Sequence, residues 1–413
     1  MNILYFASVD FYQKPNPSFH LMQSMLTDLL ENGDTVNYIG LAVKGVENHI
    51  PTEFENNPNF KYRLIEMPNT SKSNFVKRYL DGIKYAASAK KYIKEMSQST
   101  DVVFVQSSPT ALFNICVVKK TVKNNKKIIY NVQDIFPGSS IASGVMPQKW
   151  LQKVFYAIQK IAYRKSDMIV AISDDMKDKL SEQGVPPEKV EVIVNWFDDK
   201  TVSEVDWEEN RFVKLAKMDK VHFYVQYAGT IGYVFDYNMI IKVAKILKNN
   251  HEIVFQIIGE GSQKQEFIDA ANENKLDNIV FFPLQSQDMV SDVYSACSTC
   301  IIPLKHGVIG NSVPSKAGLL MACKRPIVTS SDNGSKYNTM INDNEFGFAF
   351  GDDEPDKVAE AILKLCSDKT LCKEMGIRGY KFGHELYSRT KNMKKYIDLF
   401  RSMSDYGTEC NND

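Results

Sequence analysis

The chain has 413 residues, of which 44% are hydrophobic, and its 50 Lys and Arg residues balance its 50 Asp and Glu residues. This length exceeds that of one ordinary core and favours two domains of roughly 200 residues each. The balanced charge excludes the global basic field of a nucleic-acid-binding protein, so no nucleic-acid partner is expected. Seven cysteines in apolar or helical contexts are typical of a reducing compartment and predict a cytoplasmic protein.

Short apolar runs alternate with longer amphipathic segments through the first half. The runs lie at 2–6, 35–41, 101–106, 127–132 and 167–172. The first follows the initial Met without a basic leader or cleavage pattern, so it predicts a strand and not a signal peptide. No apolar run approaches the roughly 20 residues that span a bilayer. The alternation predicts an α/β fold with parallel strands joined by helices.

The strand signal stops after Val194 and resumes near His222, which predicts a linker at 195–220. A second alternation follows, with helices near 237–247 and 263–274. We therefore predict two Rossmann-like domains, 1–200 and 201–387, that face each other across a cleft. The periodic segment 388–404 is a candidate helix for packing back on the first domain, and the polar tail 405–413 is predicted to be disordered.

Two glycine-containing loops follow predicted strands of the second domain. "YAGTIG" contains Gly229 and Gly232, and "IIGEGSQK" contains Gly259 and Gly261. Glycines let backbone N–H groups approach a ligand, and the carboxyl ends of parallel strands are where α/β folds bind ligands. The alternative is a pair of tight strand-to-helix turns, because neither loop has the full dinucleotide-binding spacing.

The stretch "GVIGNSVPSKAGLLMACKRPIV", residues 307–328, carries a lysine and no acidic residue. Pro314 suits the first turn of a helix, and the unpaired N–H groups of such a turn, together with the helix macrodipole, form an anion site. Lys316 would add positive charge to it. The alternative is a capped core helix with a lysine facing solvent.

In the first domain, Asp134 of "YNVQDIFPGSS" follows a predicted strand. A carboxylate at this position can accept a proton or hold a sugar hydroxyl, although Asp before Pro-Gly is also good turn chemistry. The loop after the first strand supplies Asn16 and Ser18, and Ser18 is also a plausible helix cap. Cys297 and Cys300 have metal or redox spacing, but no second pair completes a zinc set, so buried structural cysteines are expected.

Residues 72–94 and 148–165 are basic segments with interleaved aromatic residues. The first has seven basic residues and one acid, Asp81. Basic amphipathic helices with aromatic residues suit an anionic membrane surface. A solvated helix face is the alternative for each.

Taken in order, "VQDIFP", "AISDDMKDKL", "VIVNWFD", "QYAGTIG", "IIGEGSQ", "IIPL" and "NSVPSKAGLLMACKRPIV" resemble a family 4 bacterial glycosyltransferase of the GT-B architecture. The likeness is to enzymes that build capsule, exopolysaccharide and O-antigen repeat units. It implies retaining transfer from a nucleotide-sugar, UDP-linked, without a metal or other cofactor. The implied diphosphate-binding residues are Gly229, Thr230, Gly232, Asn311, Ser312, Pro314, Ser315 and Lys316. The implied nucleotide-binding residues are Gly259, Gly261, Pro283 and Leu284.

Many members of this family carry two glutamates at the positions of Ile309 and Ala317, and the second usually holds the donor ribose. The branch with "NSxPSK" resembles this chain and commonly lacks the pair. The family's N-terminal histidine is replaced by Gln133, so Gln133 and Asp134 become the catalytic candidates, with Asn16 and Ser18 on the acceptor side.

The resemblance also implies an acceptor saccharide on a polyprenyl diphosphate at the inner face of the cell membrane, where the two basic segments would bind peripherally. A GT-B nucleotide-sugar epimerase and a catalytically degenerate partner subunit remain alternatives.

Overall fold

The computed structural model describes residues 1–8, 17–46, 50–68, 75–108, 110–122, 126–314 and 316–409, without the side chains of 17–19, 75–76 and 405–409. The chain forms two compact units. Unit 1 contains Met1–Pro137, Pro147–Ile193 and Met393–Asp413, and unit 2 contains Gly138–Met146 and Val194–Asn392. The polypeptide therefore passes from one unit to the other several times. One of these passages lies within the helix that begins at Arg389.

Unit 1 is built on a seven-stranded parallel sheet in the order β3-β2-β1-β4-β5-β6-β7. Its strands are β1 (Asn2–Phe6), β2 (Thr35–Val43), β3 (Phe60–Met67), β4 (Val102–Gln106), β5 (Lys127–Val132), β6 (Met168–Ala171) and β7 (Val190–Val192). Every residue of β4 is buried, as expected for a central strand covered on both faces. The strand order reverses between β1 and β4, which makes this edge the topological switch point of the unit.

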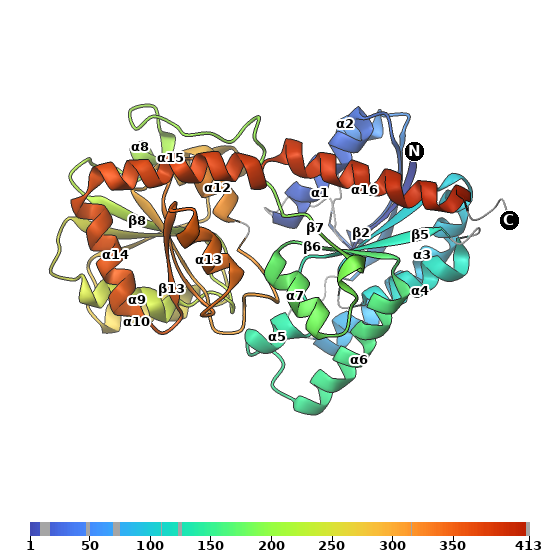
Figure 1. Ribbon diagram of the computed structural model, residues 1–413, viewed down its shortest axis with the longest axis horizontal. Coiled ribbons are helices and arrows are strands. Elements are labelled where there is room, and N and C mark those ends of the chain that lie inside the picture. Colours follow the sequence, from blue (N-terminus) through green and yellow to red (C-terminus); the bar gives the residue numbers. More distant parts are fainter. Residues whose placement is uncertain are drawn as a thin grey trace. The chain divides into compact units, whose positions relative to one another are not determined.

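Helices cover both faces of the unit 1 sheet. They are α1 (Pro17–Glu31), α2 (Thr52–Glu55), α3 (Phe75–Met96), α4 (Ala111–Thr121), α6 (Lys149–Lys165), α7 (Asp174–Glu182) and α16 (Arg389–Glu409). In Figure 1, α16 lies on one side of this sheet, and α4 and α6 lie on the other. The last helix continues through Glu409, so residues 405–409 are helical and not disordered as predicted, while 410–413 lie outside the described residues.

Unit 2 repeats the same order with six parallel strands, β10-β9-β8-β11-β12-β13. They are β8 (Phe223–Ala228), β9 (Ile253–Ile258), β10 (Ile279–Phe282), β11 (Thr299–Pro303), β12 (Ile327–Ser331) and β13 (Gly347–Gly351). Its helices are α5 (Gly138–Ala142), α8 (Arg211–Leu215), α9 (Tyr237–Ile246), α10 (Lys264–Glu273), α11 (Val290–Ser295), α12 (Lys316–Ala322), α13 (Lys336–Asp343), α14 (Pro355–Ser367) and α15 (Lys369–Leu386). The switch point of unit 2 lies between β8 and β11.

The core of unit 2 joins β8 and β9 to α9, α10 and α14. Phe255, Phe235 and Phe267 are fully buried or nearly so within it. Local signals set the helix starts: the Asp236 side chain accepts a hydrogen bond from the N–H of Asn238 at α9, and Pro355 occupies the first turn of α14. These elements place the loops after β8, β9 and β11 at one edge of the sheet.

The predicted α/β class and two Rossmann-like sheets are confirmed. Strand β3 was not among the predicted strands. It lies at the sheet edge, where Lys61, Arg63 and Glu66 are exposed. These charged residues interrupt the apolar run by which the other strands were predicted. Charged side chains on an edge strand also prevent it from pairing with other chains.

Candidate active site

The carboxyl end of β8 brings a lysine and a tyrosine together at the switch point of unit 2. The ammonium of Lys316 lies 3.6 Å from the centroid of the Tyr227 ring. Gly229 follows β8 with φ +146°, and a Cβ atom there would come within 2.6 Å of the Lys316 ammonium. Glycine at 229 therefore leaves room for this ammonium, and we call Tyr227, Gly229 and Lys316 the Lys316 site.

Burial governs the charge of Lys316. Desolvation lowers its pKa from the usual 10.5 to about 7, while the nearby Cys300 acts weakly in the opposite direction. Among the described residues, no carboxylate forms an ion pair with this ammonium. The ring of Tyr227, itself buried, packs on Phe235 with centroids 4.0 Å apart and donates its hydroxyl to the carbonyl of Thr230 at 2.7 Å. A rigid aromatic platform thus carries a cation that an anionic ligand would neutralise.

The second glycine loop packs directly against the first. A Cβ atom on Gly259 would overlap the carbonyl oxygen of Gly229, and one on Gly261 would overlap that of Ile231. The N–H of Gly229 donates to Ile258 O at 2.9 Å, and that of Ile231 donates to Glu260 O at 2.9 Å. The two loops therefore form one backbone layer at the sheet edge, and the glycines are needed for this close approach.

The loop 307–314 differs from the predicted anion cradle. The backbone N–H groups of Asn311 and Ser312 both donate to Val308 O at 3.0 Å, and the Asn311 side chain donates to Gly307 O at 2.9 Å. The helix begins at Lys316 and not at Pro314, and it has seven residues. These predicted backbone donors are therefore used to fold the loop, because a tight loop must satisfy its own polar groups.

Asp332 organises the start of this loop, and sequence reasoning missed it. Its carboxylate accepts from the N–H of Gly307 at 2.6 Å and from that of Ile309 at 2.9 Å. Its position at the end of β12 was the available signal. The positions of the absent glutamates are apolar and buried: Ala317 is fully buried and Ile309 is 9% exposed. Neither position therefore supplies a carboxylate to this edge of the sheet.

The remaining predicted residues of unit 2 surround this edge. Thr230 is exposed and Gly232 is half-buried after β8, while Pro283 and Leu284 are exposed after β10. Lys305 follows β11, and its ammonium lies 3.3 Å from the Gln263 amide oxygen. Asn16, Ser315 and the side chain of Ser18 lie outside the described residues.

In unit 1, Gln133 and Asp134 follow β5. The side-chain amide of Gln133 donates to Asn131 Oδ1 at 2.8 Å, and its backbone N–H donates to Ser107 Oγ at 3.1 Å. Gln133 is half-buried, whereas Asp134 is exposed. Ser107 follows β4, so these side chains share the carboxyl edge of the unit 1 sheet beside its switch point.

Two of the α3 aromatic residues whose side chains the structure describes, Tyr79 and Tyr85, face inward. Tyr85 is buried and donates its hydroxyl to Ala7 O, and the Tyr79 ring packs edge-on against Phe113 and Phe155. Lys72 lies outside the described residues. Tyr79 and Tyr85 are thus occupied by packing within unit 1 and are not available to a membrane surface.

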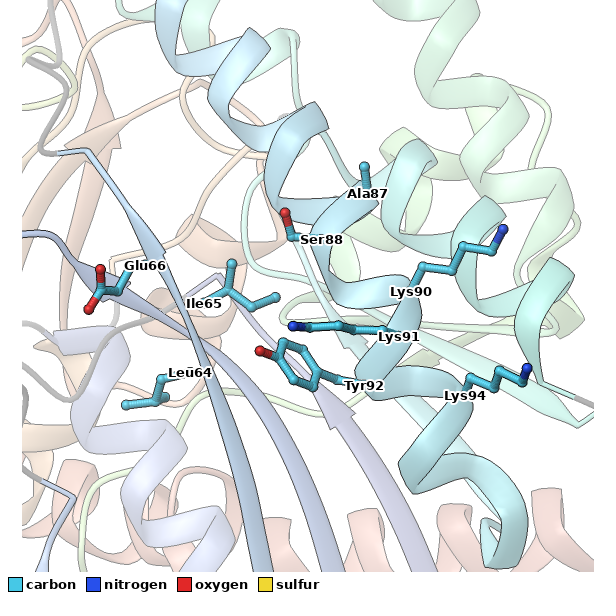
Figure 2. A pocket seen from close by; sticks show the side chains of 9 residues that line it. All are labelled: Leu64, Ile65, Glu66, Ala87, Ser88, Lys90, Lys91, Tyr92 and Lys94. Atoms are coloured by element: carbon cyan, nitrogen blue, oxygen red, sulfur yellow. The ribbon is translucent and has the colours of Figure 1, made fainter.

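Helix α3 and strand β3 line an open groove of about 890 Å³. Its residues are Leu64, Ile65, Glu66, Ala87, Ser88, Lys90, Lys91, Tyr92 and Lys94. Figure 2 shows Lys91 and Tyr92 directed toward β3, and Lys90 and Lys94 directed away from it. The Lys91 ammonium lies 4.5 Å from the Tyr92 ring centroid.

Helix α6 presents a different surface. Trp150 is 68% exposed, Val154 is 45% exposed, and Lys153 and Lys160 of the same helix are also exposed. Phe155 and Tyr163 face the core. This helix therefore displays a tryptophan and basic residues on one solvent-facing side.

Cys297 and Cys300 are buried free thiols, as predicted, and Cys300 Sγ donates to Gln226 O at 2.8 Å. Within the described ranges, no group of three or more His, Cys, Asp or Glu side chains is arranged to hold a metal ion. No helix in the described part of the chain is long and apolar enough to cross a membrane.

Two family matches cover most of the chain. Residues 207–382 match "Glycosyl transferases group 1", and residues 38–201 match "Glycosyltransferase Family 4". The first match includes the Lys316 site, and the second includes Gln133 and Asp134.

Relatives and solved structures agree with these matches. "Probable glycosyltransferase WbjE" of Pseudomonas aeruginosa is 23% identical over 75% of this chain and 77% of its own length. The poly(ribitol-phosphate) alpha-N-acetylglucosaminyltransferase of Staphylococcus aureus is 26% identical over 51% of this chain and 41% of its own.

The crystal structure of Anabaena Alr3699/HepE in complex with UDP shares the fold. It has a TM-score of 0.74 at 12% identity and covers 97% of this chain and 100% of the other. The chain is therefore a GT-B glycosyltransferase, an enzyme of the hexosyltransferase type, built from a family 4 glycosyltransferase domain followed by a group 1 glycosyltransferase domain.

Proposed function

We propose that the enzyme transfers a sugar, with retention at the anomeric carbon, from a UDP-sugar to a saccharide carried on a polyprenyl diphosphate, in the synthesis of a cell-surface polysaccharide. The UDP bound in Alr3699/HepE supports the donor class, and the poly(ribitol-phosphate) acceptor named for the Staphylococcus aureus relative supports a role in building a polymer. No metal is required in this proposal. The diphosphate charge is met by protein groups.

The single observation that carries the donor proposal is the Lys316 ammonium at the unit 2 switch point. It is held on the Tyr227 ring, beside Gly229, and has no carboxylate partner within the described residues. A diphosphate would supply the missing negative charge through a charge-assisted hydrogen bond. This edge of a doubly wound sheet is also where such folds bind nucleotides.

Lys316 would also assist the chemical step. As the acceptor hydroxyl forms its bond to the anomeric carbon, the bond between that carbon and the diphosphate oxygen breaks, and negative charge grows on the departing diphosphate. A fixed ammonium stabilises this developing charge more than it stabilises the bound donor. Asp134 would receive the hydroxyl proton or orient the acceptor through one of its hydroxyl groups.

Nucleotide binding tests the donor site. Purified protein is heated with UDP, ADP, GDP or CMP, and we expect UDP to raise the melting temperature. Lys316→Ala should weaken UDP binding on the order of 10- to 100-fold, because it removes a charged hydrogen bond. Lys248→Ala, which changes an exposed lysine, is the matched control and should bind UDP as the unchanged protein does.

Two outcomes would contradict the proposal. Absence of stabilisation by any nucleotide would remove the donor site, and unaltered UDP binding by Lys316→Ala would remove Lys316 from it. UDP binding without sugar transfer to any lipid-linked saccharide would instead identify a catalytically inactive partner subunit.

We also propose that the enzyme works as a peripheral protein on the inner face of the cell membrane, where a polyprenyl diphosphate presents its saccharide. The exposed Trp150 and the neighbouring lysines of α6 support this placement. Tryptophan settles at the level of lipid head groups, and each nearby basic residue contributes about 1 kcal/mol at an anionic surface.

A further inference from the structure

A chain of buried hydrogen bonds joins the C-terminal helix to the loop after β5. The amide nitrogen of Asn131 donates to the hydroxyl of Tyr396 on α16 at 2.7 Å, and the amide nitrogen of Gln133 donates to Asn131 Oδ1 at 2.8 Å. Asn131 is 3% exposed and Tyr396 is 2% exposed. The chain thus runs from a helix 265 residues away in sequence to the carboxyl edge of the unit 1 sheet.

The buried Asn131 is costly unless both ends of its amide have partners. It occupies the last but one position of β5, a strand whose other five residues are buried or half-buried. Tyr396 satisfies the nitrogen and Gln133 satisfies the oxygen. Tyr396 therefore holds the nitrogen end of the Asn131 amide, which leaves the amide oxygen facing Gln133.

Packing fixes the Tyr396 hydroxyl in turn. Its ring meets Phe104 of β4 edge-on at 6.0 Å between centroids and Phe400 at 6.0 Å. The backbone of Gln133 is held separately by Ser107 Oγ at 3.1 Å. Two independent contacts thus fix the residue that directly precedes Asp134.

We propose that Tyr396 is a positioning residue for the acceptor side: through Asn131 it holds the Gln133 amide in the orientation that acceptor binding requires. This inference rests on the proposed function, because it takes Gln133 and Asp134 as acceptor-side residues. Tyr396 itself touches no substrate. Its effect reaches the acceptor only through Asn131 and Gln133.

Tyr396→Phe removes one oxygen and keeps the ring packing. We expect about a tenfold loss in kcat/KM for the lipid-linked acceptor, with the KM for the UDP-sugar unchanged, since the Lys316 site lies in the other unit. A merely structural role would not separate the two substrates in this way.

Tyr130→Phe is the matched control. Tyr130 precedes Asn131 on β5, so its side chain points to the opposite face of the sheet, where its buried hydroxyl accepts from Gln159 of α6 at 2.9 Å. This variant loses a buried hydrogen bond of the same kind on the same strand but leaves the Tyr396 chain intact. Its acceptor kinetics should equal those of the unchanged enzyme.

A double-mutant cycle separates action through Gln133 from other effects. In a Gln133→Ala background, Tyr396→Phe should produce no further loss of acceptor kcat/KM. Equal losses in both backgrounds would overturn the proposed route. Should Tyr396→Phe fail to fold, Asn131→Ala interrupts the same chain at its middle residue and is judged by the same kinetics.

Hydrogen exchange gives a readout that does not depend on activity. Amide exchange of the peptide 131–136 should accelerate in Tyr396→Phe and stay unchanged in Tyr130→Phe. Identical exchange and kinetics in the two variants would overturn the inference. Absence of transfer by the unchanged enzyme would contradict the proposed function, while the exchange comparison would still decide whether Tyr396 positions Gln133.

Discussion

Lys316 and Tyr227 illustrate what single residues reveal before and after folding. Lys316 was identifiable from sequence because a lysine near a helix start opposes the macrodipole and needs another reason to be there. Tyr227 was not, because an aromatic residue in an apolar strand is usually core. The structure makes Tyr227 both buried and the surface on which the Lys316 ammonium lies.

The Lys316 pKa of about 7 predicts pH-dependent donor binding. A bound diphosphate favours the charged lysine and raises its pKa, so binding is accompanied by proton uptake once the pH exceeds 7. UDP affinity should therefore fall by up to about tenfold for each pH unit above 7. Calorimetric titration of UDP between pH 6 and 9 measures this slope.

Lys316→Ala supplies the control for that slope. Its weaker UDP binding should be nearly independent of pH above 7, because Tyr227, whose pKa is raised by burial, stays neutral there. The stability of the protein without ligand should change with pH in the opposite direction. Between pH 7 and 10.5 Lys316 is protonated in the unfolded chain and deprotonated in the folded one, so the free energy of unfolding rises with pH in that window. If UDP affinity had the same pH dependence in Lys316→Ala as in the unchanged protein, Lys316 would not be the group whose protonation controls binding.

At the scale of elements, the amphipathic character of each helix was predictable from sequence, but the surface against which the helix packs was not. The sequence gives α3 and α6 the same basic and aromatic character, yet packing against α4 and the sheet draws Tyr79 and Tyr85 of α3 inward. Helix α6 keeps Trp150 at the surface. The start of α12 was predicted two residues too early, since the hydrogen bonds of Asn311 and Ser312 to Val308 close a loop that periodicity does not encode.

The exposed face of α6 predicts binding to anionic vesicles. Trp150→Ala should weaken sedimentation with phosphatidylglycerol vesicles on the order of tenfold, because it removes a large apolar side chain that would enter the interface. The unchanged protein should also show a blue shift of tryptophan fluorescence with these vesicles and not with phosphatidylcholine alone.

Leu215→Ala is the control for that experiment, since Leu215 is 57% exposed in unit 2 and belongs to no basic helix of unit 1. It should sediment like the unchanged protein. Vesicle binding by Trp150→Ala that equals that of the control would show that α6 is an ordinary solvated helix.

For the whole molecule, alternating apolar and amphipathic segments were enough to predict two doubly wound sheets, because each βα repeat carries its own periodicity. The crossing segments were harder to assign. The segment 388–404 was only a candidate for packing back on the first domain, and Met393–Asp413 belongs to unit 1. Gly138–Met146 belongs to unit 2 although it lies within the first half of the sequence, which was not predicted. Such assignments depend on distant contacts, for example that of Tyr396 with Asn131, which no local pattern records.

Two units with separate cores predict two unfolding transitions, of which UDP should shift only one. At 100 times its Kd, a ligand specific for folded unit 2 adds about 2.7 kcal/mol to the free energy of unfolding, or roughly 5–10 °C for a domain of this size. Trp150 reports on unit 1, whereas Trp196 and Trp207 report on unit 2. Thermal fluorescence scans of Trp150→Phe should therefore retain the transition that UDP shifts. If this shift were lost in Trp150→Phe and seen only through Trp150 in the unchanged protein, the nucleotide would bind unit 1, and the proposed site in unit 2 would be wrong.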